Sequence, residues 1–159
     1  MNRVGLGFDL HPLVAGRPLI LGGVTVPSEA GLGGHSDADV LAHAVGEALL
    51  GALALGDLGR HFPDTDPQWR GVSSLLLLGH VMVLVRERGA TVLNVDATVL
   101  AQAPRLAPHL PEMAKRLADV LGIPVDRTSV KAKSPEGLGL IGRREGIAAM
   151  AVVSLDVQP

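Results

Sequence analysis

The chain has 159 residues, 47% of them hydrophobic, so it has the length of one domain and enough apolar material for one core, which excludes an intrinsically disordered protein. It carries 2 Phe, 1 Trp and no Tyr, and 14 Lys plus Arg against 16 Asp plus Glu give a net charge of −2. The chain therefore lacks both the stacking aromatics and the basic excess of a nucleic-acid-binding protein, and any phosphate ligand should be small.

The chain has no cysteine, so disulfides and thiolate metal sites are excluded, and a metal would have to bind His and carboxylate side chains. The segment Met1–Gly5 lacks the pattern of a signal peptide. The longest apolar run, Leu75–Val85, is far shorter than the roughly 18 residues that a membrane span needs. We therefore expect a cytoplasmic protein with no membrane partner.

Hydrophobic periodicity and turn residues define the expected elements. In chain order they are a strand over 2–8, two short strands within 18–27, helices over 39–55 and 73–88, a strand over 91–101, a helix over 110–121, and strands over 128–133 and 145–157. Pro12 is expected to end the first strand, and prolines interrupt residues 56–72 too often for regular structure. This order predicts one α/β (α+β) domain over residues 1–159, a mixed sheet with helices packed against it.

The last strand is apolar on both faces. Alternate residues put Ile147, Ala149, Ala151 and Val153 on one face and Ala148, Met150 and Val152 on the other. Either helices cover both faces of this strand, or one face is covered by a partner subunit.

Asp9 and His11 lie two apart in an extended segment, so both side chains point to the same side. His43 lies within an apolar helix, with Asp39 and Glu47 one turn away on either side. Asp9, His11 and His43 would together make a three-ligand zinc site with an open fourth position. The alternative is a core histidine paired with a carboxylate, plus a turn-capping Asp9, and spacing alone does not decide between them.

Two of the other polar segments have two interpretations each. His35–Asp39 precedes a helix, where backbone N–H groups either bind a phosphate or are capped by the segment's own side chains. Asp57–Gly59 and Asp64–Pro67 have the residues of simple loop turns. Lys131–Glu136 combines cations, a hydroxyl and a carboxylate, which suits a phosphate with a divalent cation or a solvated charged segment. Gly137–Gly142 matches a dinucleotide fingerprint but precedes a strand, so a Rossmann fold is rejected.

Taken together, five segments closely resemble the 2-C-methyl-D-erythritol 2,4-cyclodiphosphate synthase family. They are Gly7–His11, Gly34–Ala44, Phe62–Pro67, Ala101–Pro104 and Gly142–Ala148. The resemblance covers nearly the whole chain. It implies a homotrimer whose sheets face a threefold axis, with helices on the other face of each sheet and active sites between neighbouring subunits.

The resemblance also implies an activity. The substrate is 4-diphosphocytidyl-2-C-methyl-D-erythritol 2-phosphate, whose 2-phosphate attacks the β-phosphorus, closes the cyclic diphosphate and expels CMP in the non-mevalonate isoprenoid pathway. Such a phosphorus–oxygen lyase uses Zn²⁺ and Mg²⁺ or Mn²⁺. Two alternatives are a zinc-dependent phosphoesterase, in which water attacks, and a catalytically idle trimeric module that binds a cytidine nucleotide or a terpenoid.

Residue roles carry over by matching motif position. Asp9, His11 and His43 are implied zinc ligands, Glu136 the ligand of the second cation, and His35 and Ser134 the transition-state stabilisers. The implied substrate contacts are Asp9, His11, His35, Ser36, Asp57, Leu58, Gly59, Phe62, Pro63, Asp64, Thr65, Asp66, Ala101, Gln102, Ala103, Pro104, Arg105, Leu106, Ala107, Ala132, Lys133, Ser134, Pro135, Glu136, Leu140 and Arg143.

Ala101–Ala107 and Ala132 would form the cytosine pocket. Phe8, Leu140 and Arg143 correspond to an axial channel that could take a terpenoid diphosphate. The chain departs from the family at two places: Lys133 and Pro135 replace hydroxyl residues, and Arg144 adds a cation near the axis.

Overall fold

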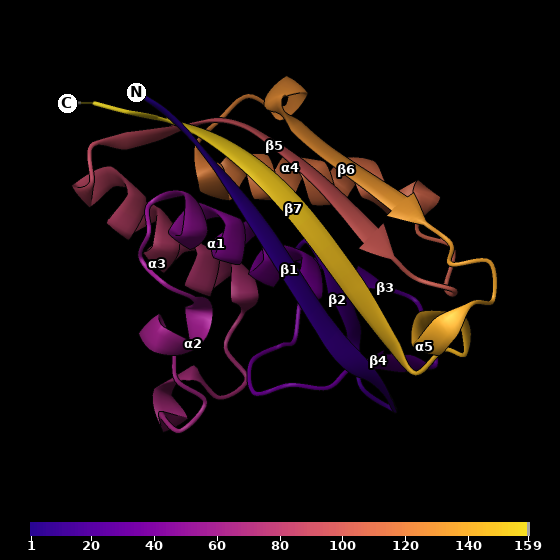
Figure 1. Cartoon of the computed structure of the whole chain (residues 1–159). Coiled ribbons are helices and arrows are strands. Elements are labelled where there is room, and N and C mark those ends of the chain that lie inside the picture. The colour runs from indigo at the N-terminus through magenta and orange to yellow at the C-terminus, as the bar shows by residue number, and fades with distance from the viewer. Residues whose placement is uncertain (159) are drawn as a thin grey trace.

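The computed structural model describes residues 1–158 and contains one five-stranded mixed sheet in the order β4-β1-β7-β5-β6, beside a two-stranded hairpin of β2 and β3 (Figure 1). In this sheet β5 and β6 are parallel, and the other neighbours are antiparallel. The strands are β1 (Asn2–Ala15), β2 (Leu19–Leu21), β3 (Val24–Val26), β4 (Ala30–Leu32), β5 (Ala90–Leu100), β6 (Thr128–Lys133) and β7 (Gly146–Val157).

The main helices pack on one face of the sheet, which crosses in front of them in Figure 1. The helices are α1 (Val40–Ala52), α2 (Leu58–His61), α3 (Ser74–Glu87), α4 (Leu110–Leu121) and α5 (Gly139–Gly142), and the 3₁₀ turns are η1 (Pro67–Trp69), η2 (Ala107–His109) and η3 (Val125–Arg127). The aliphatic core lies between sheet and helices, and α1 is its centre because ten of its 13 residues are buried. The expected mixed sheet with helices packed on one face is therefore confirmed.

Helix α1 approaches β1 very closely because two glycines of β1 face it. A Cβ atom at Gly5 would lie 1.9 Å from the carbonyl oxygen of Ala48, and one at Gly7 would lie 1.9 Å from that of Ala44. No side chain fits in such a gap, so the glycines set the distance between strand and helix. The next inward residues of β1 are Asp9 and His11, and both therefore lie close to α1.

Asp39 fixes the start of α1. Its carboxylate is fully buried and accepts hydrogen bonds from the backbone N–H groups of Gly22, Gly23 and Ala42, at 2.7–3.0 Å. One side chain thus caps the helix and closes the β2–β3 turn. Burial nevertheless raises the pKa of Asp39, against the effect of these three donors.

The two faces of β7 differ in burial, although the sequence of the strand is apolar on both. Ile147, Ala149, Ala151 and Val153 are buried beneath the helices, whereas Met150 is 43% exposed on the opposite face. Val152 and the neighbouring β1 side chains Leu6 and Phe8 are also exposed on the outside of the sheet. The interpretation with helices on both faces is therefore wrong for this chain.

Two other expectations are wrong in detail. Pro12 does not end β1: the strand leaves β7 there and continues beside β4 from Leu13 to Ala15, and the Pro12 carbonyl accepts from the Gly33 N–H. Proline is tolerated because the strand changes partner at that point. Residues 56–72 contain the short helix α2 and the turn η1, because Asp57 and Asp66 cap them.

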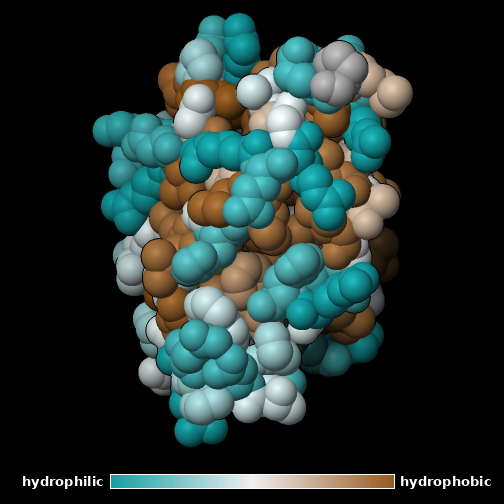
Figure 2. Space-filling view, turned by 90° about the vertical axis from the view of Figure 1, so that its left-hand side faces the viewer, coloured by the Kyte–Doolittle hydropathy of each residue, from teal (hydrophilic) through white to brown (hydrophobic). Residues whose placement is uncertain are grey.

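Figure 2 views the side of the molecule at which α3 lies, and hydrophobic residues appear there between hydrophilic ones. On α3, Leu76 and Val83 are among the exposed apolar side chains. Among residues 1–158, none of the helices has both the length and the apolar character that crossing a membrane requires.

Candidate active site

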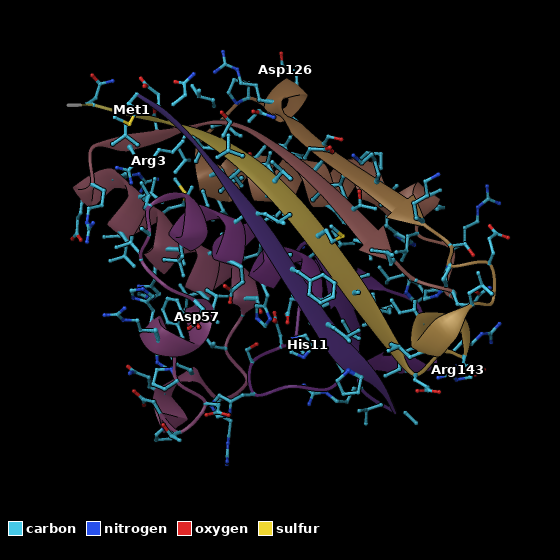
Figure 3. The ribbon with its side chains drawn as sticks, viewed as in Figure 1. Met1, Arg3, His11, Asp57, Asp126 and Arg143 are labelled. Carbon is cyan, nitrogen blue, oxygen red and sulfur yellow. The ribbon has the colours of Figure 1, made fainter. Side chains whose placement is uncertain are left out.

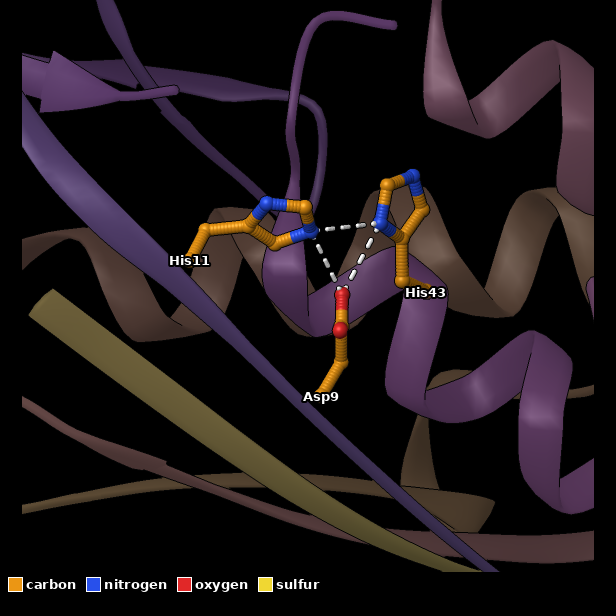
Figure 4. Close-up of side chains that lie close together, drawn as sticks. All are labelled: Asp9, His11 and His43. Carbon is orange, nitrogen blue, oxygen red and sulfur yellow. Dashed lines mark hydrogen bonds and ion pairs between the residues drawn. The ribbon is translucent and has the colours of Figure 1, made fainter. Parts of the chain in front are cut away.

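The structure brings Asp9, His11 and His43 together, with their side chains pointing toward one another (Figure 4). Asp9 Oδ2 lies 2.8 Å from His11 Nε2 and 2.9 Å from His43 Nδ1, and the two ring nitrogens are 3.2 Å apart. All three side chains are partly buried. This arrangement favours the three-donor interpretation over that of a turn-capping Asp9.

Local structure explains why they meet. The period of two in β1 places Asp9 and His11 on its inner face, in line with Gly5 and Gly7. His43 lies one turn into α1, on the side of the helix that the glycines allow to approach. The expected partners Asp39 and Glu47 have other roles: Asp39 holds the hairpin turn, and Glu47 Oε1 accepts from the Leu58 N–H at 3.0 Å.

Burial and hydrogen bonds within the cluster shift the pKa values of Asp9 and His11. Burial raises the pKa of Asp9, but hydrogen bonds with His11 and His43 and their positive charges outweigh it, so the net pKa lies well below its ordinary value. The hydrogen bond to Asp9 raises the pKa of His11. Burial also raises the pKa of Glu47. Without a metal, the site is therefore held by a carboxylate shared between two imidazoles.

The donor set fits a divalent metal ion. One carboxylate oxygen and two imidazole nitrogens are ligands that Zn²⁺ accepts, and three protein ligands with an open fourth position are typical of catalytic zinc. His11 Nδ1–H donates to the Gly33 carbonyl at 2.8 Å, which leaves the Nε2 lone pair directed at the cluster. In a tetrahedral zinc site, ligand atoms lie about 3.3 Å apart, close to the spacing found here.

A cavity of about 290 Å³ opens over the cluster. Its walls come from β1, α1, the segment before α1, residues 58–69 and α3. They are Asp9, His11, His35, Ser36, His43, Glu47, Leu58, Gly59, Phe62, Asp64, Trp69 and Leu77. Figure 3 shows His11 on β1 and Asp57 at the start of α2, toward the same side of the molecule.

Most of the loop residues expected to contact substrate lie at this cavity. His35 lines it, and its Nε2–H donates to the Asp66 carbonyl at 3.3 Å. Asp57 is exposed and caps α2 by accepting from the Arg60 N–H, so the turn interpretation holds for its side chain in this state. Pro63, Thr65 and Asp66 follow the same loop without lining the cavity, and Asp66 caps η1.

The other half of the expected site lies elsewhere, at the carboxyl ends of the parallel strands β5 and β6. A separate cavity of about 320 Å³ is lined by Ala101, Gln102, Pro104, Arg105, Leu106, Ala107, Ala132, Lys133 and Ser134. Ala103 faces a neighbouring hollow with Arg144. Among the described residues, no side chain lines both this cavity and the one above the Asp9–His11–His43 cluster.

Glu136 follows Ser134 and Pro135 on an exposed turn, and its φ of +56° is left-handed. Its N–H donates to Ser134 Oγ at 3.0 Å, and the Gly137 N–H donates to Gln102 Oε1 at 2.9 Å. These bonds hold the turn against the second cavity. Glu136 is therefore not among the residues gathered around Asp9 in one chain.

Of the expected channel residues, Leu140 lies in α5 and Arg143 directly after it, whereas Phe8 lies on β1 opposite Met150 of β7. Leu140 lines a hollow with Leu10 and His11, and Arg143 Nε donates to Glu145 Oε1 at 2.6 Å. Figure 3 places Arg143 beside α5, apart from Asp57.

Sequence reasoning missed several residues of the first cavity. Trp69, the one tryptophan, packs edge-on against Phe62 with ring centroids 5.1 Å apart. Sequence spacing marks Glu47 only as a neighbour of His43, and Leu77 only as part of an apolar run. A lone large aromatic within a polar, proline-rich loop was the available signal for Trp69, because such a side chain needs an apolar surface to pack on.

Comparisons with known proteins agree with this geometry. The YgbB family model matches residues 2–156. The 2-C-methyl-D-erythritol 2,4-cyclodiphosphate synthase of Geobacter metallireducens is 60% identical over 154 residues, which is 97% of this chain and 98% of that protein. The bifunctional IspDF of Campylobacter jejuni is 41% identical with a TM-score of 0.95 over 99% of this chain, which spans 43% of that longer protein. A 2C-methyl-D-erythritol-2,4-cyclodiphosphate synthase solved in a CDP-bound form is 42% identical with a TM-score of 0.89, covering 97% of this chain and 100% of that one.

Proposed function

The chain belongs to the YgbB family, and we propose that it is a cyclodiphosphate synthase acting on 4-diphosphocytidyl-2-C-methyl-D-erythritol 2-phosphate. The products are 2-C-methyl-D-erythritol 2,4-cyclodiphosphate and CMP, in the non-mevalonate pathway to isoprenoid precursors. The observation that carries the proposal is the Asp9–His11–His43 cluster, which lies in one cavity with His35 and Asp64. The relatives that share this fold carry the name of this synthase, and one is solved with CDP.

The reaction is an intramolecular phosphoryl transfer. An oxygen of the 2-phosphate forms a bond to the β-phosphorus, the bond from that phosphorus to the bridging oxygen breaks, and CMP leaves with the electron pair. No water is consumed, which makes the enzyme a phosphorus–oxygen lyase. Because the nucleophile is already an anion, the protein has to position it and offset charge rather than remove a proton.

The residues present suit that task. Asp9, His11 and His43 would hold Zn²⁺, and Glu136 would hold Mg²⁺ or Mn²⁺, since a lone carboxylate with phosphate oxygens suits a hard cation. Such cations polarise phosphoryl oxygens and neutralise the developing charge. His35 and Ser134 would donate hydrogen bonds to the transferring group. Asp57–Gly59 and Phe62–Asp66 would orient the erythritol and its phosphates, and Ala101–Ala107 with Ala132 would hold the cytosine.

Two observations support an active site shared between subunits of a homotrimer. The cavity over the metal ligands and the cavity expected for cytosine are lined by different residues, so one chain supplies two incomplete halves. The outer face of the sheet also carries exposed apolar side chains, among them Leu6 and Phe8 at 63% and 57% exposure. Burying this face against two copies would place Phe8, Leu140 and Arg143 near a threefold axis, where a terpenoid diphosphate would bind. We place the enzyme in the cytoplasm.

One assay distinguishes the possible activities. The purified chain is incubated with the diphosphocytidyl substrate, zinc and magnesium, and the products are followed by phosphorus NMR. Cyclic diphosphate with an equal amount of CMP is expected. CMP with a linear product would instead indicate a hydrolase, and no product at all would indicate a binding module.

The metal assignment is tested with His43→Ala. We expect zinc to be lost while circular dichroism shows an unchanged fold, because the side chain is only partly buried and lies at the cavity. Zinc content equal to that of the parent protein would refute the assignment.

Sharing between subunits is tested by complementation. Chains carrying His43→Ala and chains carrying a bulky replacement in the cytosine pocket, Ala132→Trp, are each expected to be inactive. The two variants are unfolded and refolded together. Mixed trimers should regain part of the activity, because some interfaces combine two intact halves. A mixture that stays inactive, although light scattering shows mixed trimers, would mean that each site is built from one chain.

A further inference from the structure

The outer nitrogen of His43 contacts two buried hydroxyl groups. His43 Nδ1 faces Asp9, while Nε2 lies 2.8 Å from Ser74 Oγ and 3.2 Å from Ser36 Oγ. Ser74 is 1% exposed, and it is the first residue of α3. A buried hydroxyl in this position can either donate to the imidazole or accept from it, and the choice decides which ring nitrogen carries the proton.

Asp37 settles that choice. Its Oδ1 is in close contact with Ser74 Oγ, and its Oδ2 accepts from the Ser74 N–H at 3.1 Å. Because a carboxylate only accepts, the Ser74 hydroxyl proton is directed to Asp37, and the lone pairs of Ser74 Oγ remain for the His43 Nε2–H. His43 Nδ1, which lies beside Asp9 and His11, is then the ring nitrogen left to ligate a metal ion.

We propose that Asp37 and Ser74 are positioning residues of the metal centre, acting through a chain of hydrogen bonds from His43 Nε2 to Ser74 and on to Asp37. The inference rests on the proposed metal site. In this proposal, Asp37 and Ser74 orient the ring of His43 in the same way as the Gly33 carbonyl, by accepting from Nδ1–H, orients the ring of His11. Outer partners of this kind fix the tautomer and the orientation of a ligating imidazole and raise its affinity for metal.

The same contacts tie the loop of the first cavity to the metal ligands. The Asp37 N–H donates to the Val72 carbonyl at 3.0 Å, and the Gly71 N–H donates to the His35 carbonyl at 2.8 Å. The end of the loop that carries Phe62 and Asp64 is therefore fastened to the segment that orients His43. Ser74 lies at the point where loop, α3 and metal ligand meet.

The test compares two adjacent serines. Ser74→Ala removes the hydroxyl that accepts from His43, whereas Ser73→Ala is a matched control, because Ser73 is exposed and its side chain makes no capping bond. Zinc dissociation constants are measured by competition with a chelator. We expect Ser74→Ala to weaken zinc binding about 10-fold to 100-fold and Ser73→Ala to leave it within about twofold. Asp37→Asn, which keeps the shape of the side chain, should weaken binding in the same direction.

A second readout separates positioning from simple loss of packing. Proton–nitrogen NMR spectra of the zinc-loaded protein report the Nε2–H group of His43 and the rate at which its proton exchanges with water. The parent and Ser73→Ala should show a slowly exchanging Nε2–H proton, whereas Ser74→Ala, which lacks the acceptor for this proton, should show faster exchange. A zinc-loaded parent whose Nε2–H proton exchanges as fast as that of Ser74→Ala, or Ser74→Ala with parental zinc affinity, would overturn the inference.

The outcomes also separate this inference from the proposed function. A parent that binds zinc but makes no cyclic product, together with a weakened Ser74→Ala, would refute the synthase activity and leave the positioning role standing. A parent that binds no zinc would refute the metal site and the positioning role together.

Discussion

Gly7 lies where α1 packs directly on β1, and Gly7→Ala tests whether this close approach builds the metal centre. The added Cβ would lie 1.9 Å from the Ala44 carbonyl oxygen and 2.6 Å from the Ala48 nitrogen. Ordinary contact begins at 3.4 Å, so strand and helix must move apart by about 1.5 Å. Both opposing atoms belong to the backbone of α1, so no side-chain rotation can relieve the clash.

The displacement is large compared with what a metal site tolerates. Ligand distances are usually held to about 0.2 Å, and Asp9 and His43 lie on the two elements that would separate. Overpacking typically costs about 1–3 kcal/mol. The upper end applies here because the clash is with backbone, and about 3 kcal/mol corresponds to a melting temperature lowered by about 6–12 °C. A misplacement of this size should also lower activity by about 100-fold.

Calorimetry and zinc analysis of Gly7→Ala check both effects. Gly51→Ala is the matched control, because Gly51 lies on the same helix and the nearest atom to its added Cβ is the Leu6 carbonyl oxygen at 3.8 Å. This control should be as stable as the parent or more stable, since alanine is favoured over glycine within helices by about 1 kcal/mol. If Gly7→Ala keeps the parental melting temperature and zinc content, the reasoning about close approach is refuted.

Three further predictions concern the Asp9–His11 pair, the second cation and the outer face of the sheet. In the metal-free protein, the Asp9–His11 pair should stabilise the fold fully between pH 3.8 and pH 6.5, the ordinary pKa values of the two groups, and this stabilisation should be lost as the pH rises through the raised pKa of His11. The difference in urea midpoint between the parent and Asp9→Asn should therefore shrink from pH 5.5 to pH 8.5. Glu136→Gln should abolish cyclisation yet retain one zinc per chain by elemental analysis, and full activity would contradict its role. Leu6→Lys, which places a charge on the outer sheet face, should convert the trimer into particles of 16.4 kDa in light scattering, whereas an intact trimer would show that this face is not the interface.

The sequence predicts which side chains share a face better than it predicts which elements meet. The spacing of Asp9 and His11 is enough to put both on one side of β1, because a strand has a period of two. That His43 joins them depends on the packing of α1, which begins at Val40, against two glycines of the same strand. Gly5 and Gly7 appear in the sequence only as weak strand residues, and their purpose is visible only once α1 lies on them.

The sequence also gives the wrong partners for two carboxylates near His43. Asp39 and Glu47 stand one turn from His43 on the helix, so helical spacing predicts an acidic stripe around the histidine. In the structure each carboxylate instead accepts from backbone N–H groups of another element, the β2–β3 turn for Asp39 and α2 for Glu47. Backbone N–H groups of elements distant in the sequence need acceptors, and this need, rather than the helical spacing, decides where the two carboxylates lie. A single sequence carries no signal for such long-range hydrogen bonds.

Strand β1 links the metal centre to the proposed assembly, because its two faces serve different purposes. Its odd-numbered residues from Gly5 to His11 face α1, and its even-numbered residues Leu6 and Phe8 are exposed on the outside of the sheet. A register shift of one residue would exchange the two sets, burying Phe8 against α1 and moving Asp9 away from His43. The eleven paired positions between β1 and β7, from Asn2 to Pro12, hold this register. The pairing that builds the ligand cluster therefore also presents the apolar face on which a shared active site would depend.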